Sequence, residues 1–154
     1  MRYLLRILAT LGPVGYFPVA PATAASAVTA LIGWVLPVPP LAVALGLLAV
    51  GTAAVAWVCH HAEKDLGHDA HPIVLDEMVG QSIALLGAPR EWWAFVAAFA
   101  LFRLFDIWKP LGAREAQSLR GGVGVVADDV IAGLAACGVF HVGWWGGRAL
   151  GWLG

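Results

Sequence analysis

The chain has 154 residues, of which 60% are hydrophobic and only 12% are charged, and its net charge is −1. Because a soluble domain usually carries about 25% charged residues, this composition argues against a soluble protein and favours one domain, residues 1–154, embedded in a membrane. The near-neutral charge also excludes the basic surface that a nucleic-acid partner requires.

The first part of the chain predicts three helices. Residues 3–11 form a short apolar run interrupted by Arg6, which favours an amphipathic helix at the membrane interface over a cleaved signal peptide. A proline-containing loop precedes a helix of small residues at 22–36 and a tight turn at 37–40. Residues 41–59 carry no charge and approach the roughly 20 residues that a spanning helix needs.

The second part predicts three more helices, and we expect a bundle of about five to six helices. A polar loop at 60–72 contains four histidines, which we interpret as solvated side chains rather than metal ligands. Further helices are predicted at 73–86, 92–108 and 123–142, and Pro110 is expected to end the second of these. Residues 143–154 are predicted to form an interfacial tail. Neither Cys59 nor Cys137 has the spacing of a zinc site or a disulfide framework.

Five carboxylates interrupt these apolar segments, and charge in such a setting is costly and usually kept for a function. They are Asp76, Glu77, Asp106, Asp128 and Asp129. If the helices cross a bilayer alternately, all five lie at one depth of an antiparallel bundle. Taken singly, the first pair could be favourable charges at a helix N-terminus and Asp106 could form a structural ion pair with Arg103. Their convergence favours a shared site.

The same threading places most basic residues on the side of the carboxylates. They are Arg2, Arg6, Lys64, Arg103, Lys109, Arg114 and Arg120. Only Arg90 and Arg148 fall on the opposite side. Because positive charge accumulates on cytoplasmic loops, the multi-pass topology predicts a carboxylate site that faces the cytoplasm.

Clustered carboxylates with few soft ligands are typical of sites for a hard cation, above all Mg²⁺. Arg103 and Lys109 flank Asp106 and supply the positive charge that phosphate oxygens need. The glycines at 121, 122 and 124 precede the Asp128–Asp129 pair, and glycines at a helix N-terminus can expose backbone N–H groups to an anion. The residues therefore indicate a divalent cation and a phosphate.

Three segments, IVLDEMVG (73–80), FRLFDIWKP (102–110) and GGVGVVADDVIAG (121–133), closely resemble the motifs of the bacterial phosphatidylglycerophosphatase A family. CHHAEKD (59–65) and GYFPVAPATAAS (15–26) resemble further segments of that family, so the resemblance covers about residues 12–140. It implies an all-α bundle with one helix enclosed by the others, in the bacterial inner membrane. It also implies Mg²⁺-dependent hydrolysis of phosphatidylglycerophosphate to phosphatidylglycerol and inorganic phosphate.

The resemblance further implies a set of site residues. Glycines 80, 122 and 133 would allow close helix approach. We expect Asp76, Asp128 and Asp129 to bind the metal, and Glu77 or Asp106 to orient or deprotonate the attacking water. The phosphate would be bound by Arg103, Lys109, Thr23, Ser26 and Gly122. An aspartyl-phosphate intermediate stays open. Ala22 and Ala25 stand where the family pattern has glycines.

Two other functions fit intramembrane acids. A CDP-alcohol phosphatidyltransferase also uses carboxylates and a divalent metal, but its Asp-Gly-x-x-Ala-Arg signature is absent. A small transporter or proton relay would hold its acids near mid-membrane in broken helices, whereas these acids gather near one face. A lipid phosphatase is therefore the favoured interpretation, with the membrane and its lipid substrate as the expected partners.

Overall fold

The structure, a computed structural model, describes residues 1–68, 70–109, 112–117, 119 and 121–152. Pro110 and Arg120 lie outside these residues. The described elements follow the order α1 (Arg2–Ala9), η1 (Val14–Tyr16), α2 (Pro21–Val35), α3 (Leu41–Leu66), α4 (Leu75–Ala84), α5 (Trp92–Trp108), α6 (Ala113–Gln117) and α7 (Gly122–Ala149). They include no strand, so the predicted all-α class is confirmed.

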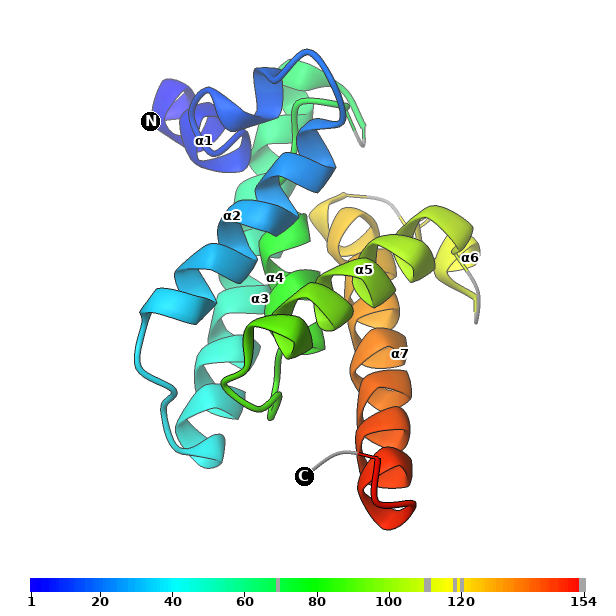
Figure 1. The fold of residues 1–154 in the computed structure, drawn as a ribbon. Coiled ribbons are helices and arrows are strands. Elements are labelled where there is room, and N and C mark those ends of the chain that lie inside the picture. Colours follow the sequence, from blue (N-terminus) through cyan, green and yellow to red (C-terminus); the bar gives the residue numbers. More distant parts are fainter. Residues whose placement is uncertain (69, 110–111, 118, 120, 153–154) are drawn as a thin grey trace.

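One helix, α4, is enclosed by the others, as predicted (Figure 1). It packs against α2, α3, α5 and α7, and seven of its ten residues are buried. A helix of this length extends only about 15 Å, which is half the roughly 30 Å hydrocarbon thickness of a bilayer. The helix α4 is thus an internal support and not a span.

The contact between α4 and α7 depends on two glycines. A Cβ atom on Gly133 would lie 2.4 Å from the carbonyl oxygen of Gly80, and a Cβ on Gly80 would lie 2.7 Å from that of Asp129. The two backbones therefore touch, in agreement with the close approach expected of these glycines. This contact fixes Asp129 of α7 beside the first turns of α4.

Two helices, α3 and α7, are long and apolar enough to cross a membrane. Almost none of the apolar part of α3 is buried within the bundle, and large apolar side chains such as Leu45, Leu47 and Val50 are exposed. An apolar surface of this extent is typical of contact with lipid. It therefore supports the predicted membrane location of the chain.

The predicted polar loop at 60–72 is wrong in its first half, because α3 continues to Leu66. This extension is stabilised by α1, which packs on α3, and by burial of Ala62. The nitrogen Nδ1 of His61 also lies 2.8 Å from the carbonyl oxygen of Trp57, one turn earlier. His60 and His61 are consequently helical residues. The helix ends at Gly67, whose φ of 100° suits glycine.

The predicted tail at 143–154 is also helical in its first half, since α7 extends to Ala149. The Arg148 guanidinium lies 5.7 Å from the ring centroid of Trp144, and the Trp144 ring packs against Trp93 of α5 with centroids 5.3 Å apart. These contacts along and between helices hold the final turns of α7 in place. Among the described residues, the segment is therefore part of a packed helix up to Ala149 and not a separate interfacial tail.

The elements alternate between two ends of the bundle. Figure 1 shows the N-terminus and the α3–α4 connection toward one end, and α6 at the side, beyond the end of α5. The α2–α3 connection, the α4–α5 connection and the C-terminus lie toward the other end. This arrangement matches the alternation that was predicted from the helix order.

Candidate metal and phosphate site

Three carboxylates from three helices meet at one point. Glu77 lies in the first turn of α4, Asp106 lies near the end of α5, and Asp129 lies in the second turn of α7. One oxygen of each lies within 4.8 Å of one oxygen of the other two. Glu77 and Asp129 are buried, and Asp106 is half-buried. We call this group the carboxylate triad.

The helix packing explains why these remote residues converge. Phe102 of α5 is fully buried, and its ring covers Gly80, where an added Cβ would lie 2.4 Å from Cε2. Asp106 follows Phe102 by one helical turn and so lies on the same face of α5. The triad thus forms where the aromatic side chain and the two helix backbones approach without intervening side chains.

Arg103 links two members of the triad. Its Nη1 lies 2.5 Å from Oε2 of Glu77, and its Nη2 lies 3.0 Å from Oδ2 of Asp106. Nη1 also donates to the hydroxyl of Ser26 at 3.3 Å, and that hydroxyl lies 3.3 Å from Oε2 of Glu77. The α2 helix is therefore part of the site. The buried Nε of Arg103 has no hydrogen-bond partner among the described residues, so one donor stays unused.

Burial and neighbouring charges shift the pKa of Glu77. Burial, followed by the negative charge of Asp106, raises the pKa of Glu77 to about 7. The charge of Arg103 and the hydrogen bonds from Arg103 and Ser26 oppose this shift without cancelling it. This pKa belongs to the site without a cation, and a bound cation would lower it.

A second charged pair adjoins the triad. The ammonium of Lys109, which caps the end of α5 with a φ of 50°, lies 2.5 Å from Oδ2 of the buried Asp128. Burial lowers the pKa of Lys109, but the hydrogen bond to Asp128 and the nearby carboxylates outweigh burial and raise it above 10.5. Lys109 is therefore a fixed positive charge next to the triad.

Asp76 is the fifth predicted carboxylate, and it is buried on the turn of α4 that carries Glu77. Its Oδ1 accepts a hydrogen bond from the backbone N–H of Glu77 at 3.0 Å. Asp76 and Asp128 both lie close enough to Asp129 to interact with it electrostatically. All five acidic side chains are thus gathered in one layer.

The triad fits a hard divalent cation. Oδ1 of Asp129 is buried without a hydrogen-bond partner among the described residues, which costs about 1–3 kcal/mol or more if nothing binds it. The nearby donors are all carboxylate oxygens, the ligands that Mg²⁺ prefers. The geometry therefore favours Glu77, Asp106 and Asp129 as ligands, whereas the sequence pointed to Asp129 with Asp76 and Asp128.

Two further residues, Thr23 and Gly122, were expected to bind the phosphate. Thr23 is half-buried in the first turn of α2, one turn before Ser26. Gly122 is buried, and a Cβ there would lie 1.9 Å from the carbonyl oxygen of Ala56 in α3. This contact accounts for a glycine at position 122 through helix packing. Binding of phosphate by Thr23 and Gly122 stays a prediction.

Gln81 is a polar residue that the sequence analysis missed. It is fully buried, and neither its side-chain nitrogen nor its oxygen has a hydrogen-bond partner among the described residues. It follows Glu77 by four residues and so lies one turn further along the same face of α4. That spacing within an apolar helix was the signal in the sequence.

The chain is similar to known proteins over most of its length. The chain matches the family model described as Phosphatidylglycerophosphatase A over residues 7–144, a range that includes all five carboxylates. No solved structure matches the chain.

Three curated relatives are similar over much of their length. A Bacteroides thetaiotaomicron protein, provisionally described as a phosphatidylinositol-3-phosphatase, is 41% identical over 85% of this chain and 87% of its own. The Escherichia coli phosphatidylglycerophosphatase A is 32% identical over 82% of this chain and 76% of its own. The Haemophilus influenzae phosphatidylglycerophosphatase A is 42% identical over 58% of this chain and 57% of its own.

Proposed function

Because the chain belongs to the phosphatidylglycerophosphatase A family, we propose that it hydrolyses the terminal phosphomonoester of phosphatidylglycerophosphate. The products are phosphatidylglycerol and inorganic phosphate. The observation that carries this proposal is the carboxylate triad with Arg103 and Lys109 beside it. Such a site combines ligands for a cation with positive groups for a phosphate.

In this proposal, Glu77, Asp106 and Asp129 hold Mg²⁺. The bound ion would polarise a phosphoryl oxygen and offset the charge that develops there. Arg103 and Lys109 bind the other phosphoryl oxygens, because a guanidinium and an ammonium form strong charge-assisted hydrogen bonds with them. Ser26 keeps Arg103 and Glu77 in register through its hydroxyl.

Glu77 or Asp106 would orient the attacking water and accept its proton through a carboxylate oxygen that does not hold the cation. The water oxygen forms a bond to phosphorus while the bond from phosphorus to the head-group oxygen breaks. The carboxylate returns the proton to the leaving oxygen, which becomes the terminal hydroxyl of phosphatidylglycerol. Asp128 holds Lys109 at the phosphate during these steps.

We place the protein in the bacterial inner membrane with the carboxylates at its cytoplasmic face. The exposed apolar surface of α3 supports the membrane location. Lys64 and Lys109 lie at helix ends on the side of the carboxylates, where the positive-inside rule expects cytoplasmic charge.

A second substrate is favoured by one comparison. The Bacteroides relative, described provisionally as a phosphatidylinositol-3-phosphatase, is 41% identical to this chain. Both candidate substrates carry a phosphomonoester on a polyol head group of a diacylglycerol lipid. The triad, Arg103 and Lys109 recognise the phosphate that the two lipids share, so a substrate panel must decide between them.

Phosphate release from the purified protein tests the proposal. The panel consists of phosphatidylglycerophosphate, phosphatidylinositol 3-phosphate and phosphatidic acid, each assayed with Mg²⁺, with EDTA, and with Mg²⁺ restored after EDTA. We expect phosphatidylglycerophosphate to be hydrolysed at least ten times faster than the others, and only with the metal. Faster release from phosphatidylinositol 3-phosphate would select the second substrate. Full activity in EDTA would contradict a metal-dependent reaction.

A further inference from the structure

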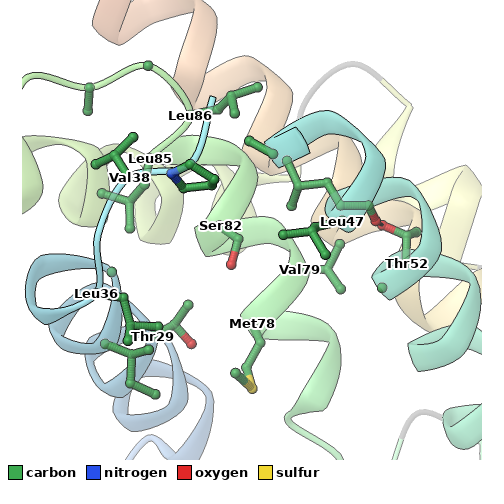
Figure 2. Close-up of a pocket in the computed structure, with 18 of the residues that line it drawn as sticks. Thr29, Leu36, Val38, Leu47, Thr52, Met78, Val79, Ser82, Leu85 and Leu86 are labelled. Carbon is green, nitrogen blue, oxygen red and sulfur yellow. Dashed lines mark hydrogen bonds between the residues drawn. The ribbon is translucent and has the colours of Figure 1, made fainter. Parts of the chain in front are cut away.

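A long apolar groove lies beside the carboxylate site on another face of α4. It has a volume of about 480 Å³ and is lined by α2, α3 and α4, with no charged side chain among its lining residues. Figure 2 shows side chains of α2 and α3 on its two sides and those of α4 between them, among them Thr29, Leu47, Thr52, Met78 and Ser82. A cavity of this size accommodates a ligand of considerable length.

The walls of the groove are apolar even where threonines line it. The hydroxyl of Thr29 donates to the carbonyl oxygen of Ala25 at 2.9 Å, and that of Thr52 donates to Leu48 at 2.7 Å. Both hydroxyls are thus satisfied within their own helices. The surface left for an occupant consists mainly of methyl and methylene groups, which favours a hydrocarbon over a polar ligand.

The groove begins about one helical turn from the carboxylate site. Met78 lines it and directly follows Glu77 in α4. Thr29 lines it from α2, one turn beyond Ser26, whose hydroxyl lies 3.3 Å from Glu77. A ligand whose head group is held at the triad can therefore extend directly into the groove.

The length of the groove matches one leaflet of a bilayer. Along α3 it extends from Ala44 to Val55, and eleven helical steps correspond to about 16 Å. Half of a roughly 30 Å hydrocarbon core is about 15 Å. An acyl chain with its head group at the carboxylate end would thus follow α3 to about the middle of the membrane.

We propose that this groove binds one acyl chain of the lipid whose phosphate is hydrolysed at the triad. The proposal rests on the proposed function, because it assigns the occupant of the groove from the head group beside it. The groove then selects diacylated lipids over soluble phosphomonoesters and orients the phosphate toward Arg103.

Two glycines of α3 provide a matched pair of variants. Gly51 lines the groove, and a Cβ there would meet no atom within 4 Å, so Gly51→Leu fills the groove without a backbone clash. Gly46 lies outside the groove on the same helix and also has free space around an added Cβ. Both substitutions replace a helical glycine by leucine, so their effects on helix propensity are equal.

The first measurement detects the acyl chain in the groove without requiring catalysis. Phosphatidic acid with a photoreactive group in its acyl chain is mixed at low fraction into phosphatidylcholine vesicles that contain the protein. We expect crosslinks at the groove residues of α2, α3 and α4, which excess unlabelled phosphatidic acid removes. Gly51→Leu should reduce them at least fivefold, and Gly46→Leu should preserve them. Labelling that is uniform over the apolar surface and unchanged in Gly51→Leu would overturn the proposal.

The second measurement compares phosphate release from long-chain phosphatidylglycerophosphate and from its deacylated head group. Gly51→Leu should lower kcat/KM at least tenfold for the long-chain lipid and less than twofold for the head group. An equal loss on both substrates would overturn the groove assignment. If the wild-type protein releases no phosphate from any lipid but the crosslinks persist, the proposed function fails and the groove stands. If Gly51→Leu changes the oligomeric state and leaves the crosslinks unchanged, the groove binds a second copy and the proposal is overturned.

Discussion

Arg103 contacts three residues of the candidate site. It pairs with Glu77 and Asp106 and donates to Ser26, so it connects α5 with α4 and α2. Asp129, by contrast, has one buried carboxylate oxygen without a partner among the described residues. Arg103 therefore balances part of the negative charge of the site. A bound cation would balance the buried negative charge of Asp129.

Replacing the carboxylate of Asp129 should separate its effect on activity from its effect on stability. We expect Asp129→Asn to lower phosphate release by roughly 100-fold or more, because the electrostatic stabilisation of the transition state is lost. The melting temperature in EDTA should stay the same or rise, since one of several mutually repelling buried charges is removed. Phosphate assays and thermal unfolding of the detergent-solubilised protein measure the two effects.

Asp65→Asn is the control, because Asp65 is an exposed acid near the end of α3. It should leave both quantities unchanged. A large drop in the melting temperature of Asp129→Asn would instead show that the carboxylate supports the fold.

Lys109 should contribute to stability as well as to phosphate binding. In Lys109→Met the buried Asp128 loses its ammonium partner, and we expect the protein to lose about 1–3 kcal/mol of stability. Adding Asp128→Asn should restore most of this stability without restoring phosphate release. Thermal unfolding of the single and double variants checks both expectations.

The direction of the pKa shift of Lys109 predicts how the stability difference between wild type and Lys109→Met depends on pH. Because the folded-state pKa of Lys109 is raised above 10.5, the stabilisation is complete below that pH. It is lost only as the pH rises through the still higher folded-state pKa. The gap in melting temperature between wild type and Lys109→Met should therefore stay constant from pH 7 to 9. A gap that closes within this range would contradict the assignment.

At the scale of elements, the position of α4 decides where the charges lie. This short helix is in contact with four longer ones, and its approach to α7 requires glycine on both sides, at positions 80 and 133. A larger side chain at either position would separate α4 from α7 and widen the triad. The glycines thus act on the chemistry through helix spacing.

Gly133→Ala tests this dependence. Its Cβ would lie 2.4 Å from the carbonyl oxygen of Gly80, a backbone atom of an enclosed helix, so we expect a loss of about 1–3 kcal/mol. Phosphate release should fall as well. Gly138→Ala on the same helix meets no atom within 4 Å and should be neutral or stabilising by about 0.5–1 kcal/mol. Equal behaviour of the two variants in thermal unfolding would refute the role of the close contact.

At the scale of the whole molecule, the alternating arrangement of helix ends predicts a sidedness. With Cys59 and Cys137 replaced by alanine, Asp65→Cys marks the carboxylate end and Val38→Cys marks the opposite end. Both native positions are exposed. A membrane-impermeant maleimide should label Val38→Cys in spheroplasts and Asp65→Cys in inverted vesicles. Labelling of both positions from one side would contradict the alternation of helix ends across the membrane. The reverse pattern would place the site at the outer face.

Local sequence patterns predicted most of the helices, and the corrections share one cause. The range 92–108 matches α5, because its apolar residues and its flanking charges agree on the same limits. The polar segment after Cys59 is helical because α1 packs against it, and the Trp-rich end is helical because Trp93 packs against Trp144. In both places a tertiary contact stabilised residues whose local composition favoured a loop or a tail.

The sequence by itself determined the all-α class, the family and the five carboxylates that gather in one layer, because charges in apolar helices are conspicuous and helix order fixes their depth. Only the tertiary structure decided that Glu77, Asp106 and Asp129 form the triad, that Asp128 pairs with Lys109, and that an apolar groove begins beside them. The physical reason is that these choices depend on the rotation and spacing of packed helices. Differences of a few ångströms there decide which side chains touch, and no single helix carries that information.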